Sequence, residues 1–165
     1  MNFNGLIHTF PKELKLLLGA FTIVLSIGFY SGLLFVVETS TIDPSGIEEQ
    51  YLGNESDEDA MVMKFKKSEK QMLTLVHNHV LSMSLIFFLL GLIMLVTKLN
   101  KKLKLFLMIE PFFSVVLTFG GLYLLWTDIL LMKYVVIFSG ALMTLSFTFS
   151  ILIIIFQLLN IKILR

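Results

Sequence analysis

The chain of 165 residues is 56% apolar and has a mean hydropathy of +0.88, well above a soluble domain, so its composition indicates an integral membrane protein. Its 13 Lys and Arg against 12 Asp and Glu leave a net charge of +1, and no basic field predicts binding to nucleic acid. The absence of cysteine excludes disulfides, thiolate metal sites, iron–sulfur clusters and a cysteine nucleophile.

Four continuous apolar runs each reach the roughly 20 residues that a helix needs to cross the hydrocarbon of a bilayer. Apolar and polar residues do not alternate within these runs, which excludes a transmembrane β-barrel. No small-residue cleavage site follows an apolar h-region at the N-terminus, and the first run has the full length of a span, so we interpret it as a retained span and not as a signal peptide. We therefore predict an all-α membrane protein, a four-transmembrane-helix bundle forming a single integral membrane domain over 1–165. The predicted spans cover about 15–37, 72–96, 105–126 and 134–159.

The cations outside the spans predict the orientation of the bundle. One group precedes the first span, one links the second and third, and one follows the fourth, so alternating helices place all three groups on one side. The positive-inside rule makes that side the cytoplasm. We expect a multi-pass protein of a bacterial cytoplasmic (inner) membrane with both termini cytoplasmic and a long extracytoplasmic loop over about 39–70. The cations are Lys12 and Lys15, then Lys98, Lys101, Lys102 and Lys104, then Lys162 and Arg165.

The loop between the first two spans has its own organisation. Asp43-Pro44-Ser45-Gly46 are turn formers, and a short amphipathic piece follows them. The segment AMVMKF (60–65) alternates apolar and polar residues, which is typical of a short strand or an extended strap. Ser68 followed by Gln71 is a capping-box pattern and predicts that the second membrane helix begins there.

Two histidines, His77 and His79, lie two to three turns into that helix, near the outer interface. Residues two apart on a helix point about 200° apart, so one regular helix cannot direct both rings at one metal. Met83 lies one turn beyond His79 on the same stripe. The two histidines are therefore predicted to serve two different sites, or one site and one structural contact.

Three interpretations of this pair stay open. In the first, His77 or His79, with Met83 nearby, ligates haem b or a transition metal such as copper, iron or zinc. In the second, a histidine and a carboxylate form a proton or ion relay. In the third, the ring nitrogens only bond to backbone, a tyrosine or a loop carboxylate. The candidate neighbours are Glu38, Glu48, Glu49, Tyr51 and Glu69.

Other polar or small residues inside the spans also predict contacts. Glu110 precedes Pro111 in the third span, and a carboxylate there should be paired or protonated, with Lys98 or Lys104 able to reach it by snorkelling. Structural anchoring is favoured over a functional acid. The pattern Gly28-x-x-x-Gly32 in the first span predicts a close helix contact, within the bundle or between protomers.

Four motifs follow one another between Gly46 and Gly91: G-I-E-E-Q-Y-L-G, M-x-F-x-K-S, M-L-x-x-x-H-x-H-x-L-S and F-F-x-x-G. Together, as GxEExYxG…MxFxKS…HxHxLS, they resemble an uncharacterised family of small four-span bacterial membrane proteins. The H-x-H that opens a span is also similar to haem-bearing spans of respiratory membrane proteins of the haem–copper oxidase type. That similarity implies haem b or copper at His77 or His79. The chain is too short for an oxidase and lacks further span histidines, so no oxidase activity is inferred.

No phosphate-binding glycine loop, nucleophile elbow, H-E-x-x-H or pair of pocket carboxylates is present in the sequence, which favours a small subunit over an enzyme. The preferred hypothesis is a membrane accessory protein of a respiratory or redox system that binds haem or a transition metal through the histidines. The alternative is a non-catalytic structural or assembly subunit whose outer loop binds a partner protein. Expected partners are the lipid bilayer and a membrane protein or a second copy of the chain.

Overall fold

The computed structural model describes residues 3–39, 43–55 and 62–159. They contain four helices that are long and apolar enough to cross a membrane, and the described residues contain no strand, which confirms the predicted all-α fold with four spans. The four are α1 (Lys12–Thr39), α3 (Glu69–Val96), α4 (Lys101–Trp126) and α5 (Met132–Leu158). Predictions at residues 60–61 and at Lys162 and Arg165 lie outside the described residues.

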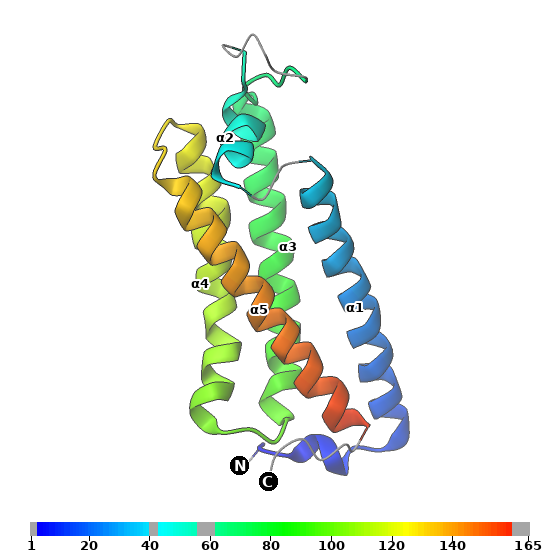
Figure 1. The fold of residues 1–165 in the computed structure, drawn as a ribbon. Coiled ribbons are helices and arrows are strands. Elements are labelled where there is room, and N and C mark those ends of the chain that lie inside the picture. The colour runs from blue at the N-terminus through cyan, green and yellow to red at the C-terminus, as the bar shows by residue number, and fades with distance from the viewer. Residues whose placement is uncertain (1–2, 40–42, 56–61, 160–165) are drawn as a thin grey trace.

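Two short helices flank the spans: the 3-10 helix η1 (Leu6–Thr9) and α2 (Pro44–Leu52). Figure 1 shows them at opposite ends of the bundle. We call the end with η1 and the α3–α4 turn the N-terminal end, and the end with α2 and the α4–α5 turn the loop end. Residues 62–67, the described part of the alternating segment and its continuation, form no regular element and are the extended strap that leads into α3.

Local capping explains where two helices begin. The capping box at the start of α3 is confirmed, because Ser68 N donates to Gln71 Oε1 over 2.8 Å and the Ser68 side chain accepts from Gln71 N. The residues predicted as turn formers instead start α2, with Asp43 Oδ1 accepting from Gly46 N over 3.1 Å. Proline favours this outcome because its fixed φ suits the first position of a helix, where no N–H is needed.

The three helices α3, α4 and α5 form the core, in which α4 packs against both neighbours. Figure 1 shows α1 standing to one side of them. Only 11% of the apolar window of α1 is buried, against 50% for α4. The close contact predicted at Gly28 and Gly32 is not made with the described residues of the chain, since a Cβ atom at either position would meet none of their atoms within 4 Å.

An aromatic cluster attaches α1 to the core. The Phe29 ring of α1 stacks on the Phe147 ring of α5, with 3.8 Å between the centroids. Phe87 of α3 approaches the same Phe147 ring edge-on at 6.2 Å. The hydroxyls of Tyr30 and Thr148 are hydrogen-bonded over 2.8 Å beside this cluster. Phe147 is fully buried, so one side chain joins three of the four spans.

The N-terminal end is closed by hydrogen bonds to the α3–α4 turn. Lys104 Nζ donates to Asn4 Oδ1 over 2.8 Å and to the carbonyl oxygens of Thr97 and Leu95 over 2.5 and 3.1 Å. The Gln157 amide donates to Lys98 O and accepts from Lys98 N, over 2.9 and 2.6 Å. Backbone groups of the turn are thereby satisfied by side chains from distant parts of the chain. Neither of the lysines predicted to reach Glu110 pairs with it among the described residues.

Candidate functional site

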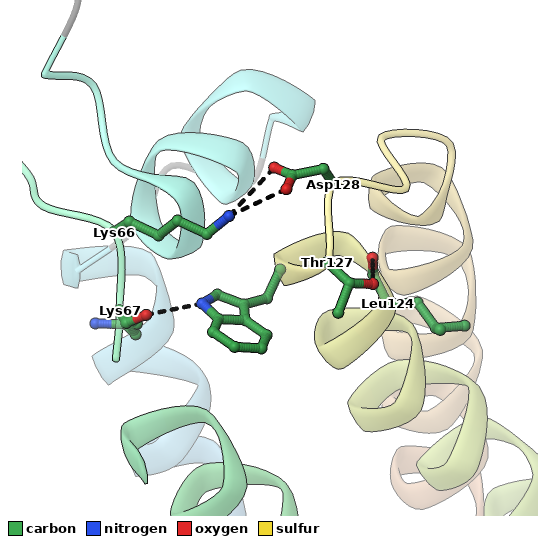
Figure 2. Close-up of polar contacts among 6 residues, drawn as sticks. Lys66, Lys67, Leu124, Thr127 and Asp128 are labelled. Atoms are coloured by element: carbon green, nitrogen blue, oxygen red, sulfur yellow. Dashed lines mark hydrogen bonds and ion pairs between the residues drawn. The ribbon is translucent and has the colours of Figure 1, made fainter. Parts of the chain in front are cut away.

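A roof made of α2 and the strap covers the loop end of the bundle. Lys133 Nζ on α5 pairs with Glu48 Oε2 on α2 over 2.6 Å. Lys66 Nζ on the strap pairs with Asp128 Oδ2 in the α4–α5 turn over 3.2 Å, as Figure 2 shows. Trp126 Nε1 donates to Lys67 O over 2.7 Å. These three contacts fix the roof to α4, α5 and the turn between them.

Gly53 ends α2 at the point where the strap packs against the helix. Its φ of +87° and ψ of 173° lie in a backbone region that is almost confined to glycine. Gly53 N donates to Glu49 O over 3.0 Å, and Asn54 N donates to Lys64 O over 2.9 Å. Lys67 N donates to Tyr51 O over 3.2 Å, so the strap runs antiparallel to the end of α2.

The acidic and tyrosine neighbours expected for the histidines make other contacts. The Glu48 carboxylate is paired with Lys133, and the backbone carbonyl of Glu49 accepts a hydrogen bond from Gly53 N. Tyr51 accepts a bond from Lys67 N through its carbonyl over 3.2 Å, and burial raises the pKa of its phenol. Glu38 and Glu69 are exposed at helix ends. None of these five side chains bonds to a histidine within the described part of the chain.

The His79 ring is held in place on the α3–α4 groove. It stacks on Phe119 of α4 with 4.7 Å between the centroids and an interplanar angle of 29°. Its Nδ1 lies 2.8 Å from the carbonyl oxygen of Leu75, one turn earlier in α3. A carbonyl can only accept, so in the neutral ring Nδ1 carries the proton and Nε2 presents a lone pair. His79 is nevertheless exposed, so this lone pair is available to another molecule.

His77 and Met83 are not brought into the same arrangement. His77 is exposed, lies on the other flank of α3 and has no hydrogen bond among the described residues. Met83 is half-buried and packs against the apolar core. The described residues also contain no group of three or more His, Cys, Asp or Glu that could hold a metal ion.

Sequence reasoning missed a polar strip beside His79. An open surface depression on the first turns of α3 is lined by Lys70, Gln71, Thr74, Leu75, Asn78 and His79. The Thr74 hydroxyl donates a hydrogen bond to the carbonyl oxygen of Lys70 over 2.7 Å. The Asn78 amide is exposed and has no hydrogen bond within the described ranges. The signal was present in the spacing, because Lys70, Thr74 and Asn78 recur every four residues along one face of the helix that was predicted to begin at Ser68.

Comparison with known proteins places the chain in a membrane family. A family model described as a transmembrane helical domain matches residues 40–162, a range that holds the roof and α3 to α5 but not α1. No curated protein and no solved structure matches the chain. The boundary of the match agrees with the small burial of α1 against the core. The chain belongs to this Aq_1264_TM family of transmembrane helical domains.

Proposed function

We propose that the protein is a non-catalytic membrane subunit that binds another membrane-spanning protein through the polar strip of α3, with His79 as the central contact. The observation that carries this proposal is the His79 ring, which stacks on Phe119 and is bonded at Nδ1 to Leu75 while the residue stays exposed. A preorganised polar group loses little conformational freedom on binding, which favours a specific partner.

The depth of His79 strengthens the argument. Trp126 is an aromatic residue of the kind that anchors at the membrane interface, and Phe119 precedes it by seven positions on α4. At 1.5 Å per residue, the level of Phe119 and of the ring stacked on it is about 10 Å from the level of Trp126. Polar groups that face hydrocarbon without a hydrogen bond are costly. The exposed Nε2 of His79 and amide of Asn78 are therefore expected to meet polar groups of a partner.

Haem or metal binding is the second candidate, and one observation favours it. A histidine whose Nδ1 donates to a backbone carbonyl has the tautomer and ring orientation that are usual for metal ligation through Nε2. The described residues contain no group of three or more His, Cys, Asp or Glu, so in this second candidate a haem b, copper, iron or zinc centre would take further ligands from the partner. In that case the protein is an accessory subunit of a redox complex.

Photo-crosslinking in native membranes tests the binding surface. A photoreactive amino acid at Thr74, whose hydroxyl bonds only its own helix, is expected to give a discrete crosslinked protein. The same residue at Phe138, which is 70% exposed on α5, is expected to crosslink lipid alone. His79→Ala should reduce the Thr74 product by about tenfold, the effect of losing one buried polar contact, and His77→Ala should leave it unchanged.

The crosslinked product also separates the two candidates. Metal or haem that co-purifies with it and disappears in His79→Ala supports the redox accessory role, whereas a metal-free product supports the purely structural one. A product of twice the mass of the chain identifies a second copy as the partner. Absence of any protein product at Thr74 would overturn the proposal.

We further propose that the termini are cytoplasmic, in a bacterial inner membrane. Lys12, Lys15 and the lysines of the α3–α4 turn lie at the N-terminal end, as the positive-inside rule requires for a cytoplasmic face. At the loop end, Lys66 and Lys133 are paired with Asp128 and Glu48. Exposed Ser45 on α2 can be replaced by cysteine in a chain that has none. Ser45→Cys in intact cells is expected to react with a membrane-impermeant maleimide, and reaction only after lysis would reverse the orientation.

A further inference from the structure

A line of side chains runs along the outer face of α3, from the polar strip towards the N-terminal end of the bundle. Its members are spaced alternately three and four residues apart, an average of about 3.5. The first member is half-buried and the others are exposed. This spacing is the one that two helices present to each other when they wrap around a shared axis. The residues of this α3 line are Leu75, Asn78, Ser82, Leu85, Leu89 and Leu92.

The chemistry of the α3 line changes along its length. The three leucines are 60%, 37% and 48% exposed, and such side chains can face lipid or another apolar helix without cost. The Ser82 hydroxyl already donates to the carbonyl oxygen of Asn78 over 2.6 Å. The Asn78 amide is exposed inside the span and has no hydrogen bond within the described ranges. Asn78 is therefore the member of the line that calls for a polar partner.

A second copy of the chain would meet this line in one defined way. Two copies have the same orientation in the membrane, so their α3 helices are parallel and are related by a two-fold axis along the membrane normal. In such a pair Asn78 is at a d position, and a d side chain packs into a hole formed by four residues of the facing helix. For Asn78 these four residues are Leu75, Asn78, His79 and Ser82 of the second copy.

The two groups that lack partners in one copy complement each other across this axis. The Asn78 amide offers N–H donors, and Nε2 of the neutral His79 ring offers a lone pair, because Nδ1 is bonded to Leu75 O over 2.8 Å. Asn78 of each copy can therefore donate to His79 of the other, which gives two equivalent hydrogen bonds. Lys70 and His77 are at c positions, away from the contact, so the pairing brings no like charges together.

We propose that the partner bound at the polar strip is a second copy of this chain, an inference that rests on the proposed function. The two α3 helices pack in parallel along the α3 line, with reciprocal hydrogen bonds between Asn78 and His79 at the loop end and leucine packing below them. Ser82, a small residue next along the line, lets the two backbones approach closely where these bonds form. The protein is then a symmetric dimer within the membrane.

Disulfide formation in native membranes tests the pairing, because the chain has no cysteine of its own. Leu85→Cys and Leu92→Cys place a cysteine at d positions, where the same residue of each copy meets. Each variant is expected to give, on mild oxidation, a product of twice the mass of the chain. Phe113→Cys is the control, since Phe113 is 67% exposed on α4 and lies six residues from Phe119, as Leu85 does from His79. This control should stay monomeric.

Asn78→Leu in the Leu85→Cys background separates specific pairing from general apolar contact. The leucine makes the face more apolar, so a non-specific contact would be kept or strengthened. Loss of the two reciprocal hydrogen bonds should instead reduce the yield of disulfide dimer by about tenfold. His79→Ala should reduce it similarly. His77→Ala, on the other flank of α3, should leave the yield unchanged.

The outcomes distinguish this inference from the proposed function. Monomer alone at both Leu85→Cys and Leu92→Cys overturns the second copy as the partner, as does a dimer whose yield Asn78→Leu does not change. A discrete crosslink from Thr74 to a different protein, together with monomer at both cysteines, overturns this inference and leaves the proposed function standing. Monomer at both cysteines and no protein product from Thr74 overturn both.

Discussion

Replacing Phe147 with alanine is expected to detach α1 from the other three spans. The Phe147 ring contacts both Phe29 of α1 and Phe87 of α3, and its loss leaves a cavity where the three spans meet. Core Phe→Ala changes cost about 3–5 kcal/mol in soluble proteins. Lipid is as apolar as this core, so mainly packing energy is lost and we expect the lower part of that range, about 3 kcal/mol.

Two measurements check the Phe147→Ala prediction. In a titration with a denaturing detergent, the midpoint of unfolding should shift to a lower detergent concentration. Spin labels on cysteines introduced at Ser31 in α1 and Thr144 in α5 should give a narrow distance distribution in the parent and a broad one in the variant. Phe149→Ala is the control, because that ring is 54% exposed on the same helix. A narrow distribution in Phe147→Ala would show that α1 is held by other contacts.

Gly53→Ala is expected to lift the roof from the bundle. The backbone conformation of Gly53 costs another residue about 1–3 kcal/mol. A Cβ atom there would also lie 2.7 Å from Lys66 N and 2.9 Å from Lys64 O, and both are backbone atoms that cannot rotate away. The strap must move, so the bond from Trp126 Nε1 to Lys67 O and the pair between Lys66 and Asp128 should be lost.

Fluorescence reports the Gly53→Ala outcome directly, because Trp126 is the only tryptophan of the chain. Its emission maximum should shift to longer wavelength, and a water-soluble quencher should reduce its fluorescence. The helix content of the variant should stay close to that of the parent protein. Gly19→Ala is the matched control, since a Cβ atom there meets no described atom within 4 Å. Unchanged Trp126 emission in Gly53→Ala would mean that the turn can relax without moving the strap.

The strap links the roof to the proposed function. The strap leads directly into the capping box of α3, so a displaced strap should loosen the first turns of the helix that carry the polar strip. The crosslink from Thr74 should therefore weaken in Gly53→Ala and persist in Gly19→Ala. Loss of α1 in Phe147→Ala should leave the same crosslink intact, because the strip lies on the groove between α3 and α4.

Features that depend on local sequence were predicted well. A bilayer forces each span to satisfy its backbone within one long helix, so four apolar runs were enough to give four membrane helices. The capping box at Ser68 and Gln71 involves only neighbouring residues, and it formed as predicted. The helical spacing of His77 and His79 also separated them, since a two-residue step fixes their directions before any packing occurs.

Contacts between distant residues were not predictable in the same way. Lys104 bonds Asn4 and the α3–α4 turn, and Glu110 bonds serines, although snorkelling made a pair between them plausible. Glu48 pairs with Lys133 across 85 positions, although it was expected near the histidines. In each case several partners had the right chemistry and reach, and the crossing of helices selected one.

The sequence by itself determined the membrane class, the four spans, the helix start at Ser68 and the separation of the two histidines. These follow from hydropathy and helical period, which act over one to a few turns. Only the tertiary structure decided that Phe119 and Leu75 hold the ring of His79, and that Phe147 joins α1 to the core. It also decided that the buried Ser150 hydroxyl has no hydrogen-bond partner among the described residues. The reason is physical, because these facts depend on how helices far apart in the chain are rotated and aligned against one another, and no local pattern encodes that alignment.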